Sequence, residues 1–194
     1  VLAYVVSGNV SDFVTKMNEL ATRIGATNTH YVNTTGLDQE GAYSTAYDQM
    51  LILAYALENP IFKTVYTTKN YTLTNGLEVE ATVNKYNRVL NLDTSKIMGS
   101  KTGNTGDAGL CMSALFYHED HEMLLVTLGA EVIEDVPYNL IDTLTLIDIV
   151  NENYVIPVEE VAMISESSAV SDVDASSVFI HYETVIVGIV LVLL

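Results

Sequence analysis

Apolar residues recur at helical spacing in three segments of the chain. The first segment starts after Asn9, a residue type that caps helices, and ends at Gly25, a residue type that stops them. Ser44 or Thr45 caps the second segment, and Pro137 opens the third. The predicted inward faces are Phe13, Met17, Leu20 and Ile24 in the first helix, Ala46, Met50, Leu53, Ala54 and Leu57 in the second, and Leu140, Ile141, Leu144, Ile147 and Val150 in the third.

Strand patterns occupy the middle of the chain. Residues 66–74 are rich in Tyr and Thr, and Asn75-Gly76 is a strong turn signal, so we predict a hairpin whose second strand reaches about Val83. Residues 84–92 are expected to be irregular. Two apolar runs, residues 110–117 and 123–129, predict an antiparallel hairpin after the strand that carries Lys101. Together these patterns indicate an α+β fold with an antiparallel sheet flanked by helices.

The connecting segments carry turn and loop residues. Asn, Thr and Gly are frequent in residues 26–43, which we interpret as an ordered loop, and Pro60 is expected to open a short helical turn. The turn His118-Glu-Asp-His121 holds two histidines and two acids, but not at the i, i+4 spacing of a helix-borne zinc motif. We therefore expect a solvated turn, and no metal or other cofactor.

The character of the sequence changes after Tyr154. Residues 159–174 are acidic and serine-rich, consistent with a linker or with the first strands of another module. We therefore divide the chain into residues 1–154 and residues 155–194. Val185 to Leu194 is an unbroken apolar run, about half the length that a membrane-spanning helix needs. It is either a buried strand or a membrane span cut short.

Composition narrows the classes of partner. The chain has 25 acidic and 8 basic residues and a formal charge of −17, which argues against nucleic acid and anionic membrane surfaces as partners. The acidity is otherwise explained by solubility. The single cysteine, Cys111, lies in an apolar strand pattern and is expected to be a small core residue. Because the chain starts without Met and without a basic leader, we expect it to begin inside a longer protein.

The stretch around Lys101 is the place where the sequence looks suited to chemistry. Lys101 carries a compact positive charge, Thr102 supplies a hydroxyl, and Gly103 leaves the backbone open to a ligand. A substrate that bears a carboxylate can use all three. No Lys or Arg follows Lys101, so an anion bound here must be held chiefly by this lysine and by backbone donors.

The same triplet belongs to a larger set of motifs that lie in order along residues 1–154. They are Phe13 to Asn18, Gly25 to Asn33, Gly36-Leu37, Tyr43 to Asp48, Asn87-Arg88, Lys101-Thr102-Gly103, Ala108-Gly109 and Leu128-Gly129-Ala130. In order and spacing this set resembles the D-alanyl-D-alanine carboxypeptidases, which belong to the penicillin-recognising serine hydrolases. The resemblance implies a β-lactamase/transpeptidase-like fold that is incomplete at its N-terminus. Residues 155–194 add nothing to it.

The resemblance also implies roles for residues 101–104. In that family the chemistry is acyl transfer by a serine, and a peptidoglycan stem peptide ending in D-Ala-D-Ala is the substrate. Lys101 would then orient the substrate and assist proton transfer, and Thr102 would bind its terminal carboxylate. Gly103 would leave room for the substrate, and the backbone N–H of Asn104 would supply one oxyanion donor. β-Lactams are implied as ligands, and the bacterial cell envelope, outside the cytoplasm, as the location, with membrane anchoring left open.

The chain departs from the family pattern in three places. The nucleophile motif Ser-x-x-Lys occurs nowhere in the sequence, so we expect the chain to be inactive alone. Ser7-Gly8-Asn9 spells the second motif, but its distance from Phe13 fits a turn in which Asn9 caps a helix; the alternative is an active motif left by a deletion. Val136 stands where many relatives carry an arginine that helps to bind the substrate carboxylate.

Two functions remain open at this point. One is the cell-wall carboxypeptidase of which this chain is a part. The other is a non-catalytic protein that binds or scaffolds peptidoglycan, keeping the fold without the chemistry, since a fold does not by itself fix a function.

Overall fold

The computed structural model describes residues 1–133, 136–156, 178–182 and 185–190. Its helices are α1 (Leu2–Ser7), α2 (Val10–Arg23), α3 (Ala46–Leu57), α4 (Pro60–Thr67), α5 (Thr82–Leu90) and α6 (Tyr138–Asn153). Its strands are β1 (Asn70–Thr72), β2 (Glu78–Glu80), β3 (Ile97–Thr105), β4 (Gly109–His118), β5 (His121–Ala130), β6 (Val132–Ile133), β7 (Val136–Pro137), β8 (Val178–Tyr182) and β9 (Val185–Val190).

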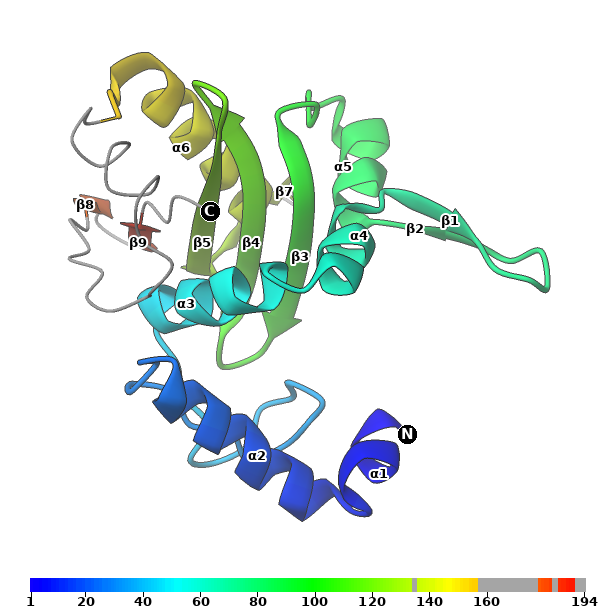
Figure 1. Ribbon diagram of the computed structural model, residues 1–194. Coiled ribbons are helices and arrows are strands. Elements are labelled where there is room, and N and C mark those ends of the chain that lie inside the picture. The colour runs from blue at the N-terminus through cyan, green and yellow to red at the C-terminus, as the bar shows by residue number, and fades with distance from the viewer. Residues whose placement is uncertain (134–135, 157–177, 183–184, 191–194) are drawn as a thin grey trace, which may run out of the picture.

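A five-stranded antiparallel sheet forms the centre of the fold, in the order β3-β4-β5-β9-β8. Helices cover both of its faces, with α3 crossing one face and α6 packed on the other (Figure 1). The strand β3, which carries Lys101, is therefore an edge strand. This arrangement confirms the α+β fold with an antiparallel sheet flanked by helices.

Side chains of β4 and β5 point alternately to the two faces of the sheet and so contribute to two hydrophobic cores. Met112, Ala114 and Phe116 point toward α6, where they pack with Leu140 and Ile147. The intervening side chains point the other way and pack with α3; this second cluster consists of Ala46, Met50, Leu53, Ala54, Leu57, Leu115, Leu124 and Val126. Because successive side chains of a strand point to opposite faces, an apolar run without polar interruptions fits a sheet that is covered on both sides.

The predicted helix caps are confirmed. The Asn9 side chain accepts a hydrogen bond from the backbone N–H of Asp12, and Thr45 does the same for Asp48. Each helix thereby satisfies one backbone N–H that has no partner within the helix. Ala46, Met50, Leu53, Ala54 and Leu57 are buried as expected, whereas α2 is mostly exposed.

The segment between α4 and β3 differs from the prediction. Tyr66 belongs to α4, the hairpin strands β1 and β2 have three residues each, and residues 82–90 form α5 instead of an irregular segment. Val83 is 1% exposed and Tyr86 packs against the same cluster, so one face of α5 is fixed to the core. Packing of this apolar face on the core therefore stabilises a helix that is too short to be stable by itself.

The turn between β4 and β5 is only partly solvated. Glu119 and Asp120 are exposed, but the His118 side chain is 5% exposed, and its ring nitrogens lie 3.0 Å from Asn151 Oδ1 and 2.9 Å from the Tyr154 carbonyl oxygen. The prediction of a fully solvated turn is therefore wrong for His118. Its imidazole joins the turn to the C-terminal end of α6.

The C-terminal strands extend the same sheet. β9 pairs with β5, and β8 pairs with β9. Residues 185–190 of the apolar run thus form a strand, while the acidic segment 159–174 lies outside the described residues. Among the residues that the structure describes, no helix is both long enough and apolar enough to span a membrane.

Candidate functional site

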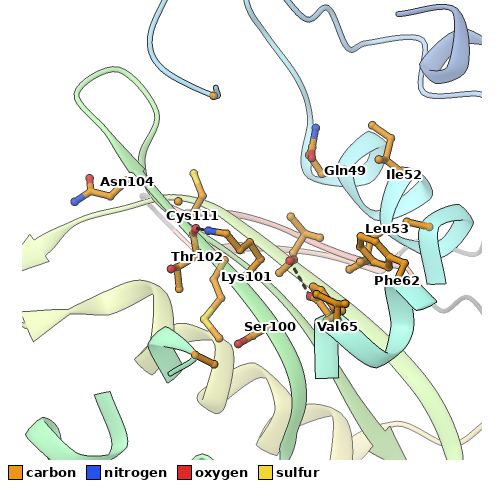
Figure 2. Close-up of a pocket in the computed structure, with 18 of the residues that line it drawn as sticks. Gln49, Ile52, Leu53, Phe62, Val65, Ser100, Lys101, Thr102, Asn104 and Cys111 are labelled. Atoms are coloured by element: carbon orange, nitrogen blue, oxygen red, sulfur yellow. Dashed lines mark hydrogen bonds between the residues drawn. The ribbon is translucent and has the colours of Figure 1, made fainter. Parts of the chain in front are cut away.

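A broad cleft with a volume of about 1340 Å³ is lined by residues 100–105 of the edge strand β3 and by residues of the neighbouring strands β4 and β5. Lys101, Thr102, Asn104 and Cys111 lie on its sheet side. The opposing side is formed by α3 and α4, with Gln49, Ile52, Leu53, Phe62 and Val65 (Figure 2). The loop that carries Thr35, Gly36 and Leu37 and the hairpin β1–β2 contribute further lining residues. The cleft exceeds the 300–1,000 Å³ that is typical of a small-molecule site, as expected for an open groove.

Lys101 and Thr102 both line the cleft. The Lys101 side chain is exposed, and its Nζ donates a hydrogen bond to the carbonyl oxygen of Thr102. The acidic side chain among the lining residues, Glu80, is engaged by Arg88, whose guanidinium nitrogens lie 2.7 and 2.9 Å from the two carboxylate oxygens. The hydrogen bonds and charge of Arg88 lower the pKa of Glu80. Glu80 is thus paired with Arg88, and Lys101, which lines the same cleft, bonds its neighbour's carbonyl oxygen.

Gly103 and Asn104 continue the same strand. A Cβ at Gly103 would contact only the Cβ of Cys111, at 3.7 Å, so the fold itself has room for a side chain there. Asn104 is exposed and lies opposite Leu110 in the register of β3 with β4. Cys111 is half-buried and lines the cleft, so the prediction that it is a core residue is only partly right.

Tyr66 and Ser113 form a contact that the sequence did not reveal. The Tyr66 hydroxyl lies 2.9 Å from Ser113 Oγ, and Ser113 is the residue of β4 directly opposite Lys101. Burial raises the pKa of Tyr66 to about 12. The phenol is therefore neutral at physiological pH. It joins the end of α4 to the sheet beside the lysine.

The loop before α3 is fixed by a buried polar network. Asp48 is 1% exposed, and its Oδ2 accepts hydrogen bonds of 2.7 Å from the backbone N–H of Asn28 and from Thr29 Oγ1. Asn18 of α2 pairs with the backbone of Tyr31 through bonds of 2.7 and 2.8 Å. These contacts confirm an ordered loop over residues 26–43. The same loop continues to Thr35, Gly36 and Leu37, which line the cleft.

Ser7, Gly8 and Asn9 lie at the turn between α1 and α2, as the sequence predicted when it assigned Asn9 to a helix cap. Gly8 has a φ of 76°, in the left-handed region, and the Asn9 side chain bonds both the N–H and the carboxylate of Asp12. Neither Ser7 nor Asn9 is among the residues that line the cleft. The structure thus brings Lys101, Thr102, Gly103 and Asn104 together with one another and leaves Ser7-Gly8-Asn9 apart.

Metal ligands do not gather in this region. Over residues 1–133, 136–156 and the two C-terminal strands, no group of three or more His, Cys, Asp or Glu side chains could hold a metal ion.

Comparison with known proteins identifies the family of the chain. The family profile of the D-alanyl-D-alanine carboxypeptidases matches residues 1–132, which is more than half of the chain. The chain belongs to this family. The carboxypeptidase DacF of Bacillus subtilis is 35% identical over 130 residues, which cover 66% of this chain and 33% of DacF. DacC of Escherichia coli is 34% identical over 135 residues, covering 67% of this chain and 32% of DacC.

Solved structures agree with the family assignment. Penicillin-binding protein D2 of Listeria monocytogenes, in its cefotaxime-bound form, matches with a TM-score of 0.59 and 26% identity, over 72% of this chain and 55% of that one. The penicillin-binding fold is therefore present in part. The chain spans about one third of the length of the curated carboxypeptidases that it matches.

Proposed function

We propose that this chain supplies the substrate-binding wall of a serine-type D-Ala-D-Ala carboxypeptidase. The observation that carries the proposal is the position of Lys101-Thr102-Gly103 on an edge strand beside an open cleft, in a chain of this family. Thr102 and Lys101 provide the hydroxyl and the cation for a terminal carboxylate. Gly103 leaves space for the peptide.

The orientation of the backbone supports a role for the N–H of Asn104. In a strand residue the N–H and C=O groups point to the same side, and this side alternates along the strand. The carbonyl of Thr102 faces the ammonium of Lys101, so residues 102 and 104 share an orientation. On an edge strand every second residue directs these groups away from the neighbouring strand, where they can bind a ligand, and the proposed role requires Asn104 to be such a residue. The loss of one oxyanion donor typically costs about 2.7–4 kcal/mol of transition-state stabilisation.

In the complete enzyme, the reaction would proceed by acyl transfer. A serine oxygen forms a bond to the carbonyl carbon of the penultimate D-alanine, and the peptide bond to the terminal D-alanine breaks. The departing amine takes a proton, and water then cleaves the ester and regenerates the serine. Lys101 would assist these proton transfers and orient the carboxylate. The nucleophile must come from outside this sequence, because Ser-x-x-Lys does not occur in it.

The proposed setting follows from the substrate. A peptidoglycan stem peptide that ends in D-Ala-D-Ala is found in the bacterial cell envelope, so the complete enzyme would act outside the cytoplasm. It would also be acylated by β-lactams. The absence of Ser-x-x-Lys favours one alternative, a non-catalytic protein that binds peptidoglycan through the same cleft.

A graft tests the enzymatic proposal. Residues 1–132 of this chain replace the matching segment of B. subtilis DacF, and the hybrid is treated with a fluorescent penicillin and with a peptide ending in D-Ala-D-Ala. We expect acylation and release of D-alanine by the hybrid, and neither by the chain alone. Acylation of the chain alone would refute the claim that the nucleophile lies outside this sequence. A folded but inert hybrid would instead favour the non-catalytic alternative.

A further inference from the structure

The loop before α3 reaches the end of the strand that carries Lys101. Asp38 Oδ2 accepts a hydrogen bond of 3.2 Å from the backbone N–H of Asp107, in the turn between β3 and β4. A Cβ on Gly106 would lie 3.5 Å from the same oxygen, so the turn passes close to the carboxylate. Residues that are far apart in the sequence are thus joined immediately beyond the Lys101-Thr102-Gly103 triplet.

Groups of this turn also act on the ionisation of Asp38. The Thr105 hydroxyl, followed by the backbone N–H groups of Asp107 and Gly106, lowers the pKa of the Asp38 carboxyl. The carboxylate is ionised at neutral pH, and the hydrogen bond that it accepts from the backbone N–H of Asp107 is charge-assisted and hence stronger than a neutral one. Thr105 Oγ1 in turn accepts from the backbone N–H of Ala108, at 3.2 Å. The turn is held on both sides of Gly106.

The loop itself is stiffened from within. Asn33 Oδ1 accepts hydrogen bonds from the backbone N–H groups of Thr35 and Gly36, at 3.0 and 2.9 Å. Asn33 Nδ2 donates to the carbonyl oxygen of Leu37, at 2.9 Å. Asn33 therefore ties Thr35, Gly36 and Leu37 together as one unit, and the next residue is Asp38. A contact made by Asp38 sets the position of the whole unit.

That unit forms part of the cleft. Thr35, Gly36 and Leu37 line it together with residues 102–105 of β3. Leu37 is 65% exposed and offers its apolar side chain to whatever occupies the cleft. The distance between β3 and the wall formed by residues 35–37 decides which ligands can contact both.

We propose that Asp38 is a positioning residue, which holds the wall formed by residues 35–37 at the distance from β3 that a D-Ala-D-Ala peptide requires. This inference rests on the proposed function, since it assumes that residues 101–104 bind that peptide. Asp38 itself touches no substrate. It acts through the turn that ends β3 and through the loop that precedes it.

The test is a ligand titration of the full chain, labelled with ¹⁵N, using N-acetyl-D-Ala-D-Ala. We expect saturable shifts in the wild-type protein at amides of both walls, residues 35–37 and residues 102–105. In Asp38→Ala, the affinity should fall at least about five-fold, and the shifts at residues 35–37 should disappear. Asp38→Asn keeps an acceptor oxygen and should recover most of the affinity.

Asp93→Ala is the matched control. Asp93 is also an exposed carboxylate that accepts a backbone N–H, from Ser95 at 2.9 Å, but it is not among the residues that line the cleft. We expect wild-type affinity from this variant, and melting temperatures within about 2 °C of wild type for all three.

Each other outcome overturns a defined claim. Binding by wild type that Asp38→Ala leaves unchanged would refute the positioning role and leave the proposed function standing. A loss of affinity that follows a large drop in melting temperature, without rescue by Asp38→Asn, would also refute it, because it would indicate a general structural role. No saturable binding by the wild-type chain would refute both.

Discussion

Tyr66 occupies the space that a side chain at Gly99 would need: a Cβ on Gly99 would lie 2.7 Å from Tyr66 Cδ1 and 2.8 Å from its carbonyl oxygen. Gly99 is two residues before Lys101 on β3, so the end of α4 sits directly against the backbone of the candidate site. The glycine allows this close approach, and the Tyr66 hydroxyl then reaches Ser113 on the neighbouring strand.

Gly99→Ala is therefore expected to destabilise the fold. The backbone contact cannot relax by a simple rotation of a side chain, and overpacking of this kind costs about 1–3 kcal/mol. Because the chain has no tryptophan, urea unfolding is best followed by circular dichroism. Gly103→Ala, in the same strand, is the control, since its Cβ would make only an ordinary 3.7 Å contact. Equal stability of the two variants would contradict the packing argument.

Gly103→Val should abolish ligand binding with little loss of stability. The fold leaves this position open, so the valine side chain would project into the cleft where the peptide is proposed to lie. Acylation of the DacF hybrid by a fluorescent penicillin should fall at least about 100-fold, in line with the loss of a major transition-state contact. Asn104→Ala should be nearly silent, because its proposed contribution is a backbone N–H. Normal acylation of Gly103→Val would exclude this placement of the substrate.

Most of the regular structure could be predicted from the sequence, because it follows from long periodic patterns. The helices that begin after Asn9 and Thr45 and the strands β4 and β5 all have repeated apolar positions and clear end signals. The helix α5 was missed because it is short and follows a Tyr- and Thr-rich stretch. Its inward residues, Val83 and Tyr86, are three positions apart, and this spacing was the available signal.

The candidate site could be predicted only where its residues are consecutive. Lys101 to Asn104 share one strand, so their sequence already placed them together. Tyr66, Ser113 and Asp38 join the site through tertiary contacts between residues 47 or 69 positions apart. No local pattern encodes such contacts, because they depend on how the helices and loops pack on the sheet.

Asp48→Ala should cost more stability than Asp12→Ala. Both aspartates are the third residue of a helix whose cap bonds their backbone N–H, so both lie in the first turn, where a negative charge is favourable. Asp48, however, is buried and accepts bonds from Asn28 and Thr29, which join the loop to α3. Hydrogen bonds to charged groups contribute about 1.5–3 kcal/mol each.

Urea unfolding should therefore show a loss of about 2–4 kcal/mol for Asp48→Ala. For the exposed Asp12→Ala we expect a loss below about 1 kcal/mol. Comparable losses would mean that the buried network does not anchor the loop.

Tyr66 should make the stability of the protein fall at alkaline pH, an effect that Tyr66→Phe should lack. Its pKa is raised from 10.0 to about 12 because burial disfavours the phenolate. Below pH 10 the hydroxyl is protonated in both folded and unfolded chains. Between pH 10 and 12 only the unfolded chain releases the proton, so stability falls as pH rises through this window. Two pKa units correspond to about 2–3 kcal/mol.

The measurement is urea unfolding of both proteins at pH 9 and near pH 12. At pH 9 we expect wild type to be more stable by about 1 kcal/mol, through the Tyr66–Ser113 hydrogen bond. Near pH 12 this advantage should vanish or reverse, because only wild type has the titrating phenol at position 66. Tyr31, whose pKa burial also raises, is present in both proteins and cancels in the comparison. A difference that stays constant with pH would mean that the Tyr66 hydroxyl titrates alike in the folded and unfolded chain.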